Sequence, residues 1–106
     1  MTTPSSDPGT PLFLVVTIYP KIDKLAEAEA QLHRMRAASQ QEEGCDFMHL
    51  VEGSDDDTWV MIEKFASRAA WDVHMASEHN QRGNRELEPL LRQPSDLNLF
   101  HEKLPG

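Results

Sequence analysis

The sequence predicts an α+β domain with six elements in the order strand, helix, strand, strand, helix, strand. Two observations lead to this order. The spacing of apolar residues changes along the chain from strand-like to helical and back, and Gly, Pro and Asp residues fall at the changes. With 106 residues, 39% hydrophobic and 26% charged, the chain is long enough for one globular domain and too short for two.

The first half of the chain begins with a segment that has no cluster of apolar side chains to bury in a core. Residues 1–11 are rich in Pro, Ser, Thr and Gly, and we expect a disordered N-terminal tail there. We expect the folded domain to span residues 12–104. It opens with Leu12–Tyr19, a near-continuous apolar run that predicts a strand buried on both faces. A helical period follows from Asp23, the predicted N-cap, to about Gln40.

The second half contains a hairpin and a broken helix. Strands are predicted at Cys45–Glu52 and Thr58–Phe65, joined by the polar turn 53–57. A helical region then runs from about Arg68 to Leu91. We expect a break near Ser77, which can cap a second helical piece, so this region is not one regular helix.

The element order, completed by a strand at Asp96–Lys103, predicts a ferredoxin-like fold. Two right-handed βαβ units give a four-stranded antiparallel sheet with both helices on one face. Because the first strand is apolar on both faces, the other face of the sheet must also be covered. A second copy of the chain is the economical cover, so we expect a homodimer.

Composition excludes several classes of partner. The net charge is −8 and the pI is near 4.9. Nucleic acids and anionic membrane surfaces both require a basic face, so neither is an expected partner. There is no apolar run of transmembrane length, and the N-terminus lacks the features of a secretory signal. The cytoplasm is therefore the expected compartment.

The second helical region carries candidates for a binding cavity. With Leu87 facing inward, the inward row also contains Asn80, Gly83, Asn84 and then Leu90 or Leu91. Three of these residues are polar or lack a side chain, which would leave a void against the sheet. We interpret the void as a cavity for a small organic molecule. The alternative is that the helix is rotated and these residues face solvent.

The start of the same region carries a candidate catalytic histidine. Ser67 stands where a helix N-cap belongs, and Trp71, His74 and Met75 then share one helix face. His74 could act as a general acid–base or donate to a substrate oxygen. The alternative is a partly buried histidine whose ring is satisfied by a backbone carbonyl.

Glu63 is a carboxyl inside an otherwise apolar strand. If its face is buried, its pKa should be raised and it needs a partner. It could position a histidine or bind a substrate hydroxyl. The alternative is a structural ion pair with Arg68 or another arginine. Met48 and Met75 could line an apolar pocket, although Met is also ordinary core filler.

Neither a metal nor a cofactor is predicted. His79 lies five residues after His74, roughly 140° around a straight helix, so the two would share a metal only if the break at Ser77 realigned them. We therefore expect His79 at the surface. The single cysteine, Cys45, excludes an internal disulfide, and no Gly-rich phosphate loop is present.

Four motifs, taken together, resemble the antibiotic biosynthesis monooxygenase (ABM) family of the dimeric α+β barrel superfamily. They are Glu-Glu-Gly-Cys (42–45), Ile-Glu-Lys-Phe-Ala-Ser-Arg-Ala-Ala-Trp (62–71), His-Met-Ala-Ser-Glu-His (74–79) and Leu-Glu-Pro-Leu-Leu (87–91). The resemblance implies a dimer with a pocket between sheet and helices. Some members oxygenate quinols or polyketide-derived aromatics without flavin, metal or haem. The pocket positions that are usually aromatic fall at Met48 and Phe65 here.

The resemblance disfavours haem degradation. Haem-degrading relatives carry an Asn on the first strand, which is missing here, and their Trp and haem-ligating His positions fall at His74 and Asn84. Our hypothesis is a cofactor-independent monooxygenase for a small aromatic, quinol or polyketide-like substrate and dioxygen. His74 and Glu63 are the candidate catalytic residues. The substrate-binding candidates are Trp71, Met48, Phe65, Met75, Asn80 and Asn84. The alternatives are a non-catalytic metabolite-binding module and a cofactor-free isomerase.

Overall fold

The computed structural model describes residues 9–53 and 57–105 and confirms the predicted order of elements. The elements are β1 (Leu12–Ile18), η2 (Ile22–Lys24), α1 (Leu25–Ser39), β2 (Cys45–Glu52), β3 (Trp59–Phe65), α2 (Arg68–Ala76), α3 (Glu78–Leu87), η3 (Glu88–Leu90) and β4 (Asp96–His101). Most of the predicted tail (1–8) and of the predicted turn (54–56) lies outside the described residues.

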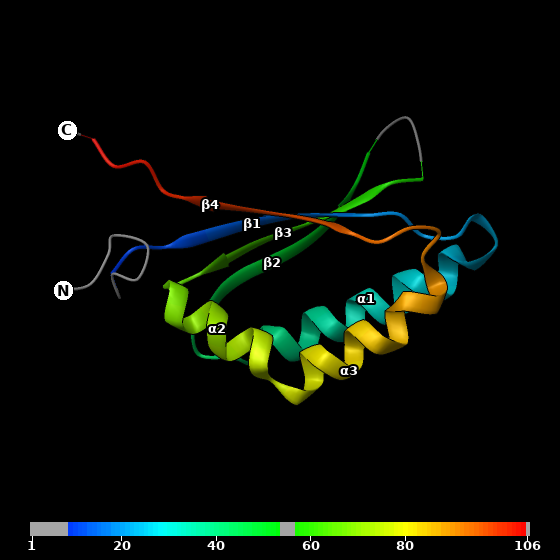
Figure 1. Ribbon diagram of the computed structural model, residues 1–106, viewed down its shortest axis with the longest axis horizontal. Coiled ribbons are helices and arrows are strands. Elements are labelled where there is room, and N and C mark those ends of the chain that lie inside the picture. The colour runs from blue at the N-terminus through cyan, green and yellow to red at the C-terminus, as the bar shows by residue number, and fades with distance from the viewer. Residues whose placement is uncertain (1–8, 54–56, 106) are drawn as a thin grey trace.

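The four strands form one antiparallel sheet in the order β2-β3-β1-β4. All three α-helices lie against the same face of this sheet, as Figure 1 shows. The predicted ferredoxin-like fold is therefore confirmed. The predicted second helix is two helices, α2 and α3, which meet at Ser77 as expected. Within the described residues, no helix is both long and apolar enough to cross a bilayer.

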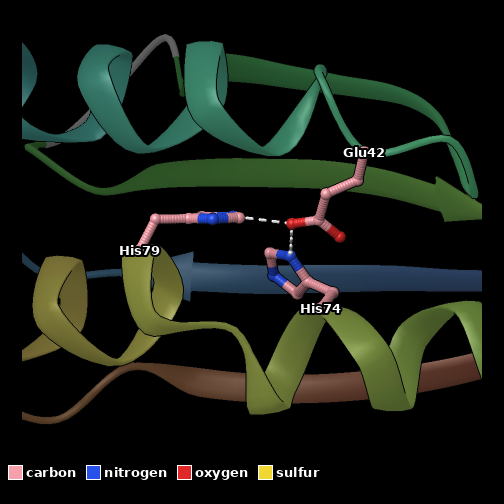
Figure 2. Close-up of side chains that lie close together, drawn as sticks. All are labelled: Glu42, His74 and His79. Atoms are coloured by element: carbon pink, nitrogen blue, oxygen red, sulfur yellow. Dashed lines mark hydrogen bonds and ion pairs between the residues drawn. The ribbon is translucent and has the colours of Figure 1, made fainter.

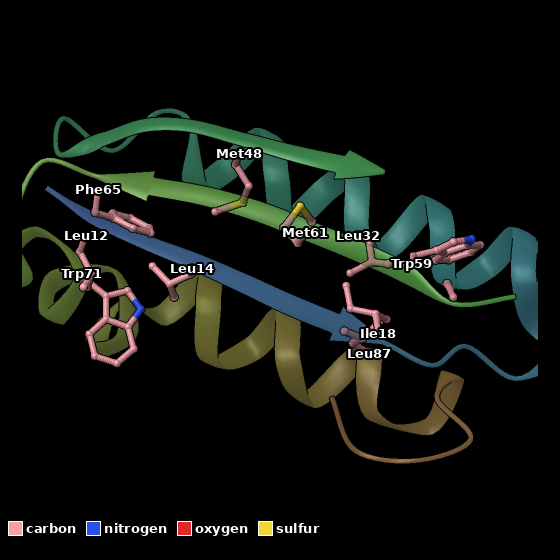
Figure 3. Close-up of a cluster of buried hydrophobic side chains, with 11 residues drawn as sticks. Leu12, Leu14, Ile18, Leu32, Met48, Trp59, Met61, Phe65, Trp71 and Leu87 are labelled. Atoms are coloured by element: carbon pink, nitrogen blue, oxygen red, sulfur yellow. The ribbon is translucent and has the colours of Figure 1, made fainter. Parts of the chain in front are cut away.

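The core lies between the sheet and the helices. Alternate side chains of β3 point toward the helices and are buried, and those between them are half-buried. Leu12, Leu14 and Ile18 of β1 join them, and Leu32 and Leu87 close the core from the helix side (Figure 3). Burying a large apolar side chain stabilises the fold by about 1.5–3 kcal/mol. These contacts fix the helices on the sheet.

The opposite face of the sheet carries a row of aromatic side chains. Phe47, Lys64, Phe13 and Phe100 are opposite one another on successive strands, so they share this face. The Phe13 and Phe47 ring centroids are 6.5 Å apart, and Phe100 is 51% exposed. No helix within the described residues covers this face (Figure 1).

Two of the three predicted helix N-caps are confirmed. Ser67 accepts a hydrogen bond from the backbone N–H of Ala70, and Ser77 accepts one from that of Asn80, so both predicted caps are confirmed. The prediction that Asp23 caps the first helix was wrong. Asp23 lies inside η2, and α1 begins after Lys24 without a side-chain cap.

The void predicted along the inward row of α3 is present as a cavity lined by Asn80, Asn84 and Leu87, but Gly83 itself does not line it. A Cβ atom on Gly83 would lie 2.8 Å from Cγ of Met35, so α1 fills this space from the other side. The Gln31 side-chain amide also donates to the Gly83 carbonyl over 3.0 Å. Gly83 therefore allows α1 and α3 to approach closely, and the cavity lies elsewhere along α3.

Candidate active site

A cavity of about 200 Å³ lies between the sheet and the helices. Seven of the eight predicted site residues line it: Glu63, His74, Trp71, Met48, Met75, Asn80 and Asn84. An engineered apolar cavity of about 150 Å³ is known to hold benzene. The volume is therefore suited to a single substituted aromatic ring.

Phe65 is the predicted site residue that does not line the cavity. It is fully buried at the end of β3, and its ring centroid lies 4.9 Å from that of His74. The structure therefore places Phe65 outside the cavity lining, and its contact with substrate stays a prediction. Its alternation with Trp59, Met61 and Glu63 places it on the helix-facing side, where its ring packs against that of His74.

Glu63 is a buried carboxyl that faces the cavity from the centre of the sheet. It is 7% exposed, and no described residue donates a hydrogen bond to it. Burial, assisted by the negative charge of Glu42, raises its pKa from 4.5 to about 7. The alternative of an ion pair with Arg68 was wrong, because Arg68 binds Asp72 over 3.4 Å instead.

His74 lines the cavity and also contacts the carboxylate of Glu42. Its ring is almost completely buried, and Nδ1 lies 2.9 Å from Oε2 of Glu42 (Figure 2). A neutral imidazole whose Nδ1–H donates to a carboxylate leaves Nε2 as a bare acceptor. Nε2 is on the side of the ring away from Glu42 and has no partner among the described residues (Figure 2). The predicted alternative, a ring bonded to a backbone carbonyl, is not what the structure shows.

His79 meets the same carboxylate, contrary to expectation. Its Nε2 lies 2.6 Å from Oε2 of Glu42, and its side chain is 30% exposed. The expectation that His74 and His79 point in different directions assumed a straight helix. Ser77 is extended, with φ −67° and ψ 146°, and its hydroxyl donates to the carbonyl of His74 over 2.7 Å. This break turns α3 so that both histidines face Glu42.

Glu42 is the site residue that sequence reasoning missed. It lies in the connection between α1 and β2, and its side chain is only 14% exposed. One of its carboxylate oxygens accepts from two imidazole rings that come from two different helices. The available signal was its place in the Glu-Glu-Gly-Cys motif, but nothing in a local pattern connects residue 42 to residues 74 and 79.

Two further polar groups bear on the chemistry of the site, the indole N–H of Trp71 and the thiol of Cys45. Trp71 lines the cavity, and its indole N–H is buried and has no hydrogen-bond partner among the described residues. Its nitrogen is on the side of the ring toward Leu14 (Figure 3). No lysine or arginine is among the described residues that line the cavity. Burial and nearby acids raise the pKa of the Cys45 thiol to about 11, so Cys45 is not a thiolate nucleophile.

The protein family to which this fold and cavity belong is identified by comparison of the sequence with family models. The family model of antibiotic biosynthesis monooxygenases matches residues 11–86, so the chain belongs to the ABM family. This is a monooxygenase-like family with the ferredoxin-like fold described above.

Individual relatives agree with this assignment. The chain is 28% identical over 85 residues to "Putative monooxygenase Rv0793" of Mycobacterium tuberculosis, which covers 80% of this chain and 84% of that protein. The structure of Rv0793 superposes with a TM-score of 0.82 at 26% identity, covering 91% and 97% of the two chains. PA3566 from Pseudomonas aeruginosa superposes with a TM-score of 0.82 at 28% identity, covering 92% and 99%.

Proposed function

We propose that this protein is a cofactor-independent monooxygenase that oxidises a small hydroxylated aromatic compound, of the quinol type, with dioxygen. Membership of the ABM family supports the reaction class. The single observation that carries the proposal is His74, a buried residue of the cavity lining whose Nδ1 is held by the partly buried Glu42 carboxylate while its Nε2 has no partner among the described residues. This arrangement is suited to removing a proton from a bound hydroxyl.

The cavity favours an uncharged, one-ring substrate. Its lining is mostly apolar and contains no lysine or arginine among the described residues, so neither of these cations is there to neutralise a carboxylate or phosphate group. The Trp71 indole N–H and the amides of Asn80 and Asn84 can bind substrate oxygens. Of the predicted substrate classes, a quinol therefore fits better than a polycyclic polyketide.

In the proposed reaction, Nε2 of His74 removes a proton from a quinol hydroxyl. The Glu42 carboxylate stabilises the imidazolium that forms, as a carboxylate does in other His-carboxylate pairs. The electron-rich quinolate then reduces dioxygen. One oxygen atom enters the ring and the other leaves as water. The quinol supplies all four electrons and becomes a hydroxyquinone, so no external reductant is required.

Glu63 supports this reaction as a hydrogen-bond donor. With its pKa raised to about 7, it is largely protonated below neutral pH and can donate to the second oxygen of the substrate. It also avoids placing a second full negative charge close to Glu42. This role differs from that of His74, which must be deprotonated to act as a base.

We also propose that the protein is a cytoplasmic homodimer. The uncovered sheet face presents three phenylalanines in one row, and a large exposed apolar face on a small chain is typically an interface. A second copy presents the same face, so two sheets can pack against each other and bury both rows.

The test is oxygen uptake with a panel of hydroquinones, measured with and without protein. We expect uptake above the spontaneous rate, accompanied by one hydroxyquinone per dioxygen consumed. His74→Asn should lower kcat by about 10²–10⁴-fold, the usual contribution of a general base. His33→Asn is the matched control, because His33 is an exposed histidine on α1 that is paired with Glu29.

Three results would contradict the proposal. Uptake at the spontaneous rate would exclude oxygenation, and an unchanged rate in His74→Asn would exclude the assigned base. If the quinol raises the melting temperature without being consumed, the protein is a binding module. Conversion of substrate without oxygen uptake would identify an isomerase.

A further inference from the structure

Glu42, His74 and His79 form a compact group of potential metal ligands. They come from three separate elements: the connection after α1, the helix α2 and the start of α3 (Figure 2). One ligand atom from each residue lies within 4.8 Å of the others. None of the three side chains is more than 30% exposed, so the group differs from the exposed acidic clusters common on protein surfaces.

We propose that these three residues bind one divalent transition-metal ion of the Zn²⁺ type, and that the bound metal inhibits the base function of His74. Two imidazoles and one carboxylate form a ligand set found in zinc sites. Imidazole nitrogen favours Zn²⁺, Co²⁺ and Ni²⁺ over Mg²⁺ and Ca²⁺, which prefer oxygen ligands. With a net charge of −8, the chain also attracts cations.

Small movements would convert the hydrogen-bonded group into a metal site. The present N···O separations are 2.9 Å for His74 and 2.6 Å for His79. Metal–ligand distances of about 2.0–2.2 Å in a tetrahedron place ligand atoms about 3.4 Å apart. Each of these two N···O pairs must therefore open by less than about 1 Å, and the two ring nitrogens, which lie within 4.8 Å of each other, must reach the same spacing. Glu42 lies in a connection and His79 is partly exposed, so both can move, and a metal can enter from the His79 side.

The metal would lie on the far side of the His74 ring from the substrate cavity. His74 lines the cavity, whereas Glu42 and His79 do not. A metal bound to Nδ1 replaces the proton there, and the neutral ring then carries its one N–H on Nε2. Nε2 changes from an acceptor to a donor and cannot remove a proton from the substrate. This inhibitory consequence rests on the proposed function, whereas the metal site itself does not.

Binding is tested without any substrate. Chelator-treated protein is titrated with Zn²⁺ by calorimetry, and Co²⁺ is added separately to record its visible spectrum. We expect one Zn²⁺ per chain and the intense bands of tetrahedral Co²⁺. His79→Gln and Glu42→Gln should each weaken Zn²⁺ binding at least about tenfold, since even residues that only support metal ligands contribute that much.

His33→Gln is the matched control and should bind Zn²⁺ as the unmodified protein does, because His33 is exposed and does not belong to the group of Glu42, His74 and His79. Thermal melts of each variant without metal establish that it is folded. Equal affinity in His79→Gln and the unmodified protein would overturn the site. So would a loss of binding in His33→Gln, or an octahedral Co²⁺ spectrum in the unmodified protein.

Inhibition is tested by oxygen uptake with and without Zn²⁺. At a Zn²⁺ concentration that saturates the unmodified protein, its rate with Zn²⁺ should be at least tenfold below its rate without. For His79→Gln at the same concentration, the rate should fall only by the fraction of sites that its own measured Zn²⁺ affinity fills, whatever the basal rate of that variant. Zn²⁺ binding without inhibition would retain the metal site and refute the inhibitory role. An absence of quinol oxidation under all conditions would refute the proposed function and leave the binding result intact.

Discussion

Replacing Glu63 by Gln should remove a pH-dependent loss of stability. The unfolded chain ionises a glutamate near pH 4.5, whereas the folded protein retains the Glu63 proton until about pH 7. Between these values the folded state binds more protons than the unfolded state, so the free energy of unfolding falls as the pH rises. Above pH 7 the full loss is present, and below pH 4.5 it is absent.

The size of this loss follows from the two pKa values. A change from 4.5 to about 7 corresponds to about 3 kcal/mol, at about 1.4 kcal/mol for each pH unit. Water that enters the cavity would solvate the carboxylate and reduce the value, so about 3 kcal/mol is an upper figure. Gln has nearly the same shape as protonated Glu and cannot ionise. Its stability advantage should therefore be near zero at pH 4 and about 1–3 kcal/mol at pH 8.5.

The assay is urea denaturation at a series of pH values, followed by circular dichroism in buffer that contains a chelator. The quantity of interest is the unfolding free energy of Glu63→Gln minus that of the unmodified protein. Glu52→Gln, at an exposed position on β2, is the control and should give a difference that does not change with pH. A difference for Glu63→Gln that is equally independent of pH would refute the reasoning, because the carboxyl would then ionise alike in both states.

Three further predictions concern packing, the helix break and assembly. Gly44→Ala should destabilise the fold by about 1–3 kcal/mol, because the new Cβ would lie 2.4 Å from Cβ of Ala70. Adding Ala70→Gly should restore part of the lost unfolding free energy, as measured by urea denaturation. Ser77→Ala should cost about 1 kcal/mol of unfolding free energy through the lost cap of α3, and an unchanged value would contradict that role. By light scattering, the unmodified protein should have twice the 12.0 kDa chain mass, Phe100→Glu should be monomeric, and Val73→Glu, at an exposed helix position, should remain dimeric.

Much of the fold could be predicted because it depends on local patterns. The alternating side chains of β3 and the apolar run of β1 identify strands without reference to the rest of the chain. Ser67 and Ser77 were identifiable as caps because an N-cap bonds to a backbone N–H only three residues away. Asp23 was misassigned because a 3₁₀ turn precedes α1, and the sequence contains no distinct signal for such a turn.

Part of the candidate site could also be predicted, because it too depends on local patterns in the sequence. His74 and Trp71 follow from helical spacing, and Glu63 follows from its place in an apolar strand. The close packing at Gly83 could not be predicted, because the residue that fills the space beside it, Met35, comes from a helix far away in the sequence. Phe65 was assigned to substrate binding by family resemblance, whereas packing against His74 buries it completely.

The sequence by itself determined the order of elements, the sheet-and-helix layers and the residues that face the helices, because these depend on periodicity and on short-range hydrogen bonds. Only the tertiary structure placed Glu42 against His74 and His79. That contact spans more than thirty residues and depends on the angle between α2 and α3 at Ser77. Local sequence restricts such an angle without fixing it, since the packing of both helices on the sheet decides it.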